Sequence, residues 1–184
     1  MLKQIINPKF IFFLIYTVVL SLIVIQLYYS PEENTSFVAE IDGLIYKAGS
    51  SDPLTGEVSD TVNNKIIKYN VINGIKQGSF MIYSSDGKIE VEGKVQNNKN
   101  VGEWRYYYPN GTLESIGNFV NDLPDGEWKW FYPDGALKEI GYFIEGKKEG
   151  TWVKYDQEGL FQKSVTYIKG EVVNEVIRPQ DYLI

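Results

Sequence analysis

The chain has 184 residues and a net charge of −6, and it contains neither cysteine nor histidine. These absences exclude disulfides, thiolate metal sites and thiol nucleophiles, and they remove the commonest general base and metal ligand. Only Lys3 and Lys9 of the 18 basic residues precede residue 31, so the remainder carries 16 basic against 24 acidic side chains. This balance disfavours nucleic acid as a partner.

The N-terminal part of the chain is strongly apolar. The run from Phe10 to Tyr29 has no charged residue, and as a helix it would span about 30 Å, the thickness of a bilayer core. We therefore predict a transmembrane helix at 10–29. Basic residues precede this run and acidic residues follow it, which predicts a cytoplasmic N-terminus at 1–9 and an extracytoplasmic remainder. The alternatives are a cleaved secretory signal and a buried helix of a soluble protein.

The polar, acidic stretch 30–42 is predicted to be a linker. It leads into a predicted repeat domain at 43–184, in which residue types recur every 24 positions. We place the units at 56–77, 78–101, 102–125, 126–149 and 150–173, with N-terminal and C-terminal caps at 43–56 and 172–184. The columns that define the period include Gly78, Gly102, Gly126 and Gly150; Phe80, Trp104, Trp128 and Trp152; and Tyr83, Tyr107, Phe131 and Tyr155.

Each unit reads as strand, turn, strand, turn. Pro109-Asn110-Gly111 has the residue order of a tight turn, and the segments around it are rich in β-branched and aromatic residues. We interpret the repeating glycines as turn residues and predict an antiparallel β-meander ribbon of 24-residue hairpins. The predicted strands are 79–84, 88–96, 103–108, 112–120, 127–132, 136–144, 151–156 and 160–168.

The spacing Gly-x-Trp-x-x-Tyr-x-x-x-Gly resembles the MORN-repeat variant family, over roughly Gly56 to Gly170. The resemblance implies an all-β repeat ribbon and brings no catalytic residues. The chain departs from the classical motif, because it has no Tyr-x-Gly-x-Trp core. Classical MORN repeats are linked to membrane lipids and protein scaffolding, and some variant relatives are described as antitoxin components. The resemblance thus implies an antitoxin-like component of a toxin–antitoxin pair as one functional alternative.

Several carboxylates lie close together in sequence: Glu90 with Glu92, Asp122 with Asp125, and Asp156 with Glu158. Such pairs hydrolyse glycosidic bonds when a cleft holds them about 5–10 Å apart. Here they alternate with apolar residues or fall in predicted turns, which favours solvated positions. The sequence shows no phosphate loop, nucleophile elbow or Asp-x-Asp calcium pattern. We therefore expect no enzyme activity, no cofactor and no metal site.

The aromatic residues are the better candidates for a binding function. We expect the Trp column to pack, with Gly117 and Gly141 leaving room for an indole on the neighbouring strand. The candidate partner-binding residues are Tyr106, Tyr108, Trp130 and Tyr132. Other units replace these residues with Ile82, Ser84, Lys154 and Asp156, a tolerance that favours a local binding patch over an obligatory core.

Trp104 and Tyr107 are three residues apart, as are Trp128 and Phe131. Odd offsets in a regular strand point to opposite faces. We expect one aromatic row on each face of the sheet; the alternative is a β-bulge that brings the two positions to one face.

These observations predict a non-catalytic, membrane-anchored module that binds a protein partner outside the cytoplasm. Binding of a carbohydrate or cell-wall polysaccharide through the central aromatics is the alternative of a different class.

Overall fold

The computed structural model describes residues 38–178, all within the unit of the chain that begins at Ser36. This range contains thirteen strands and no helix, so the predicted all-β architecture is confirmed for it. Between residues 38 and 178 no helix is long and apolar enough to span a bilayer. The helix predicted at 10–29 lies outside the described residues.

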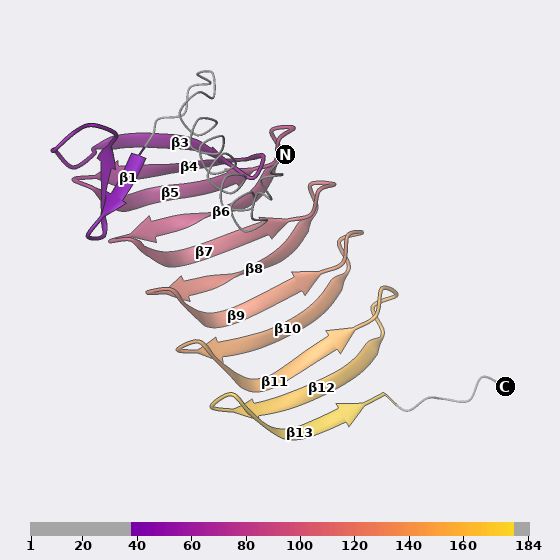
Figure 1. Ribbon diagram of the computed structural model, residues 1–184. Coiled ribbons are helices and arrows are strands. Elements are labelled where there is room, and N and C mark those ends of the chain that lie inside the picture. Colours follow the sequence, from indigo (N-terminus) through magenta and orange to yellow (C-terminus); the bar gives the residue numbers. More distant parts are fainter. Residues whose placement is uncertain (1–37, 179–184) are drawn as a thin grey trace, which may run out of the picture. The chain divides into compact units, whose positions relative to one another are not determined.

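Two sheets make up the described fold (Figure 1). The first is a hairpin of β1 (Val38–Ile41) and β2 (Leu44–Lys47), and β1 falls in the stretch predicted as linker. The second sheet has eleven strands in sequence order, each antiparallel to the next, as the predicted meander requires. Its strands are β3 (Gly56–Val62), β4 (Lys65–Ile72), β5 (Ile75–Tyr83), β6 (Ile89–Gln96), β7 (Lys99–Tyr107), β8 (Leu113–Val120), β9 (Leu123–Phe131), β10 (Leu137–Ile144), β11 (Lys147–Tyr155), β12 (Phe161–Ile168) and β13 (Glu171–Ile177).

The turns at the two margins of the large sheet differ in type. Along one margin, two-residue turns such as Asn97-Asn98 and Asn121-Asp122 have positive φ at both positions, the geometry that matches the twist of a hairpin. Along the other margin, the Pro-Asn-Gly turn is closed by the amide of Gly111, which donates to the carbonyl oxygen of Tyr108 at 2.8 Å. The predicted Pro-Asn-Gly turn therefore forms.

The glycine column Gly78, Gly102, Gly126 and Gly150 lies inside strands, so its interpretation as turn residues is wrong. Between β8 and β9, Ile116 pairs with Lys129 and Asn118 pairs with Asp125, so three residues of β9 face one residue of β8. This β-bulge needs a left-handed backbone at its first residue, and Gly126 adopts φ 84°. The first strand of each unit consequently starts about four residues earlier than predicted.

The bulge places a tryptophan over the preceding strand. A Cβ atom at Gly117 would collide with the indole of Trp128, and Gly141 stands in the same relation to Trp152. Each indole also donates a hydrogen bond through Nε1 to a carbonyl oxygen ten residues earlier; for Trp128 the acceptor is Asn118, at 3.1 Å. The predicted role of these glycines is confirmed, and Trp128 is only 6% exposed on a single-layered sheet.

A small aliphatic core closes the N-terminal end of the large sheet. Ile45 of β2 packs on Val58 of β3 and Val71 of β4, and all three are at most 2% exposed. Backbone hydrogen bonds fix the contact: the amide of Ile45 donates to Gly74 O at 2.8 Å, and the amide of Leu54 donates to Ile45 O at 2.8 Å. The β1–β2 hairpin therefore covers this end of the sheet.

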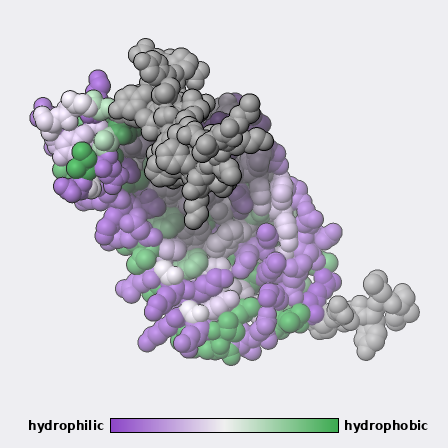
Figure 2. Space-filling model, viewed as in Figure 1, coloured by the Kyte–Doolittle hydropathy of each residue, from purple (hydrophilic) through white to green (hydrophobic). Residues whose placement is uncertain are grey.

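The C-terminal end of the same sheet has no such cover among residues 38–178. Every residue of β13 is exposed, and its aliphatic side chains Val172, Val173, Val176 and Ile177 are 49–65% exposed. In Figure 2, hydrophobic atoms gather at the lower margin, where Figure 1 places β12 and β13. The outer edge of β13 is thus an open strand edge.

Candidate interaction surface

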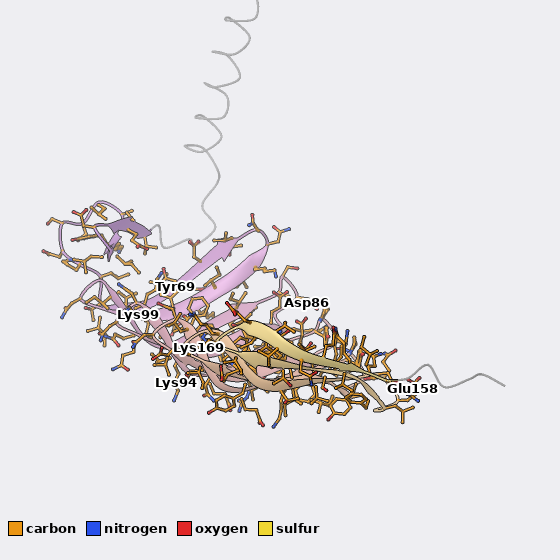
Figure 3. All side chains as sticks on the ribbon, turned by 90° about the horizontal axis from the view of Figure 1, so that it is seen from below. Tyr69, Asp86, Lys94, Lys99, Glu158 and Lys169 are labelled. Atoms are coloured by element: carbon orange, nitrogen blue, oxygen red, sulfur yellow. The ribbon has the colours of Figure 1, made fainter. Side chains whose placement is uncertain are left out.

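Side chains project from both faces of the large sheet (Figure 3), and the contacts on the two faces differ. On the face that we call the aromatic face, the rings of Trp104 and Tyr106 lie 6.5 Å apart between centroids. On the opposite face, which we call the polar face, the hydroxyl of Tyr107 donates to Glu92 Oε1 at 2.6 Å. Tyr107 therefore points away from Trp104, as the two-row expectation requires. A bulge does follow Tyr106, but its extra residue, Glu114, belongs to β8.

The rings of the aromatic face form one continuous ladder across the sheet. Successive centroids lie 5.4–6.5 Å apart, in tilted or stacked geometries that are favourable for aromatic pairs. Phe119 and Phe143 add edge-to-face contacts from the intervening strands. The ladder runs through Phe80, Trp104, Tyr106, Trp128, Trp130 and Trp152.

Two of the candidate partner-binding residues, Tyr106 and Trp130, are links of this ladder. Tyr106 lies between Trp104 and Trp128, and Trp130 lies 5.7 Å from Trp128 and 5.4 Å from Trp152. Burial raises the pKa of the Tyr106 hydroxyl above its usual value. Both rings remain half-buried, so each offers one exposed side to a ligand while its other contacts support neighbouring units.

The other two candidates, Tyr108 and Tyr132, connect successive hairpins. The hydroxyl of Tyr108 donates to the carbonyl oxygen of Phe131 at 2.8 Å, and that of Tyr132 donates to Tyr155 O at 2.9 Å. The pKa of Tyr108 is raised, first by desolvation and then by the nearby Glu114. Sequence reasoning missed this role. The only signal available for it was that Tyr108 and Tyr132 are 24 residues apart.

The carboxylates that are close in sequence have separate partners. Glu90 pairs with Lys65 at 2.6 Å, and Glu92 accepts from Arg105 as well as from Tyr107. Asp156 pairs with Arg178 at 3.4 Å. No group of three potential acidic metal ligands occurs in the described part of the chain.

One row of cross-strand neighbours changes character along the aromatic face. From β5 to β12 it runs through Ile82, Val91, Tyr106, Ser115, Trp130, Glu139, Lys154 and Lys163. The row is apolar in the first units and charged in the last. Lys154 occupies the position that Tyr106 and Trp130 have in the ladder, so the ladder ends at Trp152.

Lys148, Lys154 and Lys163, which we call the lysine cluster, line a hollow of about 250 Å³ on this face. The Nζ atom of Lys148 lies 3.8 Å from the ring centroid of Trp152 and 4.0 Å from Glu139 Oε1. Lys163 Nζ pairs with Glu175 Oε1 at 3.0 Å, and this hydrogen bond raises the pKa of Lys163. Val165 and Tyr167 complete the walls together with the ring of Trp152.

Comparison with known protein families gives a match for two of these repeat units. The family described as MORN repeat variant matches residues 100–121 and 124–145, which fall on β7–β8 and β9–β10. These units are MORN repeat variants. The family predicted from the sequence is therefore confirmed, and MORN repeats are generally modules for interaction with proteins or membranes.

No curated protein matches the chain. Among solved structures, a chain from the structure titled "Crystal structure of accessory secretory protein 1,2 and 3 in Streptococcus pneumoniae" is similar at 15% identity and a TM-score of 0.21. The similarity covers 85% of the present chain and 24% of that chain, so the present chain spans about a quarter of the other's length.

Proposed function

We propose that the chain is a non-catalytic interaction module, held at a membrane by residues 10–29, that binds a protein partner outside the cytoplasm through the open edge of its repeat sheet. The observation that supports this best is the contrast between the two sheet ends. At one end the β1–β2 hairpin packs on β3 and β4 without pairing with the outer edge of β3, whereas at the other end β13 exposes both its aliphatic side chains and an unpaired strand edge among the described residues. Such an edge accepts an added strand from a partner.

The form of the large sheet supports binding rather than catalysis. It is a single layer beyond the β1–β2 hairpin over residues 38–178, and its hollows are shallow and open. Three of the carboxylates that are close in sequence, Glu90, Glu92 and Asp156, are paired with separate basic residues. An extended surface of this kind suits recognition of another chain.

The partner experiment uses the tagged full chain, cross-linked in cells and purified from detergent extracts. A proline in place of Val173 removes a backbone donor and hinders pairing at the outer strand. We expect Val173→Pro to lose a cross-linked partner that the wild type captures. The matched control is Val62→Pro in β3, at the opposite end of the sheet, which should retain it. Equal capture by both variants would reject the β13 edge as the binding surface.

The membrane proposal rests on the uncharged run 10–29 and the charges that flank it. Protease added to intact spheroplasts should digest the repeat domain and leave a membrane-bound N-terminal fragment. Protection of the repeats until lysis would contradict the orientation. A mature protein that lacks residues 1–30 would identify a cleaved signal instead.

A polysaccharide ligand is the second candidate, because Tyr106 and Trp130 keep half-exposed rings on the aromatic face. Binding to immobilised cell-wall polysaccharide should then fall in Tyr106→Ala and persist in Tyr142→Ala, whose exposed ring lies outside the ladder. If both variants bound the immobilised polysaccharide as well as the wild type does, this candidate would be rejected.

A further inference from the structure

The lysine cluster is a departure from the repeat that costs the fold a favourable contact. At the position of Lys154, the two preceding units place Trp130 and Tyr106, each of which bridges two tryptophans. Lys154 has no aromatic or ionic contact of this kind within residues 38–178, so the ladder loses a link there. A stabilising pattern that is abandoned at one position often marks a functional site.

The backbone register adds a second observation. Lys154 and Lys163 are direct cross-strand partners on β11 and β12, so two like charges lie side by side on the same face. Cross-strand pairs of this kind have Cβ atoms about 4.5–5.5 Å apart, and like charges there destabilise a sheet. Lys148 reaches the same hollow from the start of β11. Three lysine side chains therefore line one small volume.

The two nearby carboxylates leave part of this charge uncompensated. Glu139 is paired with Lys148, and Glu175 is paired with Lys163. The three lysines and these two glutamates together carry one net positive charge. No ion pair connects Lys154 to a carboxylate in the described residues, although the whole chain is acidic. An anion bound at Lys154 and Lys163 would offset this positive charge.

The chemistry of the lining residues selects the kind of anion. An ammonium group is a compact charge with three donors, and lysine is a common ligand of phosphate oxygens. The polar lining of the hollow consists of three lysines and of Glu139, whose carboxylate is paired with Lys148. Val165 and Tyr167 add an apolar wall beside the charges. The hollow of about 250 Å³ has room for a phosphate group and a small organic substituent.

We propose that Lys154 and Lys163, with Lys148 beside them, bind a phosphate ester of a small polyol or sugar on the aromatic face of β11 and β12. The lysines hold the phosphate oxygens, and the polyol carbons lie against Val165 and Tyr167. This site is separate from the β13 edge, so its failure would leave the proposed protein interaction untouched. The ester is either a free solute or part of a lipid headgroup.

The test is calorimetric titration of the full chain, in neutral detergent micelles, with glycerol 1-phosphate and with glycerol as the uncharged comparison. We expect the wild type to bind the phosphate ester, to ignore glycerol, and to lose affinity as salt rises. The double variant Lys154→Gln/Lys163→Gln should bind at least tenfold more weakly. Lys99→Gln removes one lysine charge away from the hollow, at the start of β7, and it should bind like the wild type.

A second variant separates binding from folding. Lys154→Trp restores the residue of the preceding unit, so it should raise the urea midpoint of unfolding while it abolishes binding of glycerol 1-phosphate. Micelles doped with phosphatidylglycerol distinguish the two sources, because a lipid ligand would compete with the soluble ester. No binding by the wild type, or equal binding by the wild type and the double glutamine variant, would overturn the proposal.

Discussion

The two ends of the eleven-stranded sheet are built from the same repeat, yet they are finished in opposite ways. At the N-terminal end, Ile45 covers Val58 and Val71, and the aromatic face begins with apolar residues. At the C-terminal end, Val176 follows Trp152 by one repeat length but is exposed and pairs with Ser164, and lysines replace ladder residues. The array thus keeps antiparallel backbone pairing throughout, while its side chains pack against one another in the first units and are exposed or charged in the last.

The largest expected effect contrasts Trp128 with Val176, which lie two repeat lengths, or 48 residues, apart in the sequence. Trp128→Ala removes an indole that contacts four other rings and fills the space over Gly117, so it should lower the free energy of unfolding by about 3–5 kcal/mol. Val176→Ala at the open edge should change it by less than about 0.5 kcal/mol. Urea unfolding of the full chain, followed by circular dichroism, measures both. Similar losses of unfolding free energy in the two variants would show that side-chain packing stabilises the edge strand as much as the centre of the sheet.

The cap provides the next contrast, between Ile45 and Ile177. Ile45 is 2% exposed and Ile177 is 65% exposed. Ile45→Ala should destabilise the protein by about 2–5 kcal/mol because it leaves a cavity in the cap, whereas Ile177→Ala should be nearly neutral. The same unfolding assay applies. A neutral Ile45→Ala would mean that the β1–β2 hairpin does not stabilise the sheet.

A smaller effect is expected from the glycine column under the indoles. Gly117→Ala inserts a methyl group where the ring of Trp128 lies, and it should cost about 1–3 kcal/mol and alter tryptophan fluorescence. Val165 holds the same column position beneath the end of the ladder. Val165→Ala should cost only about 1 kcal/mol, the value of one or two buried methyl groups. If Gly117→Ala were silent, the indole would not depend on that close approach.

The hydroxyl of Tyr108 should contribute about 1 kcal/mol through its hydrogen bond to the next hairpin, so Tyr108→Phe should be destabilising by that amount. Tyr142→Phe is the control, since Tyr142 is 49% exposed and lies on the surface. Urea unfolding midpoints give the difference in stability between the two variants, provided that the dependence of the unfolding free energy on urea is the same. Equal midpoints would remove Tyr108 from the contacts that join successive units, and would return it to the candidates for partner binding.

The smallest effect concerns pH. Burial raises the pKa of Tyr106 above its usual value of 10.0, so the folded state binds this proton more tightly than the unfolded chain. The associated stability is complete below pH 10 and declines as the pH rises through the folded-state pKa. Wild-type stability should therefore fall more steeply above pH 10 than that of Tyr106→Phe. Parallel pH profiles for the two proteins would contradict the burial of this hydroxyl.

Sequence reasoning located the strands well but misjudged the glycines of the first column. Gly78 and Gly102 have the period and composition of turn residues, and only the register shows that they form bulges inside β5 and β7. The candidate site was affected similarly. Trp130 and Tyr132 are two positions apart, yet one packs between tryptophans and the other donates a hydrogen bond to the next hairpin. Contacts between units 24 residues apart depend on strand pairing, which local pattern does not specify.

The sequence by itself determined the repeat length, the antiparallel meander and the MORN-variant units, because strand alternation and turn chemistry are local properties of the chain. The tertiary structure decided which residues meet across strands. Bulges and register place Trp128 on Gly117, set Lys154 beside Lys163, and leave β13 exposed while the β1–β2 hairpin packs on Val58 and Val71. These features arise from pairing between distant segments, so they emerge only when the hydrogen-bonded sheet is assembled.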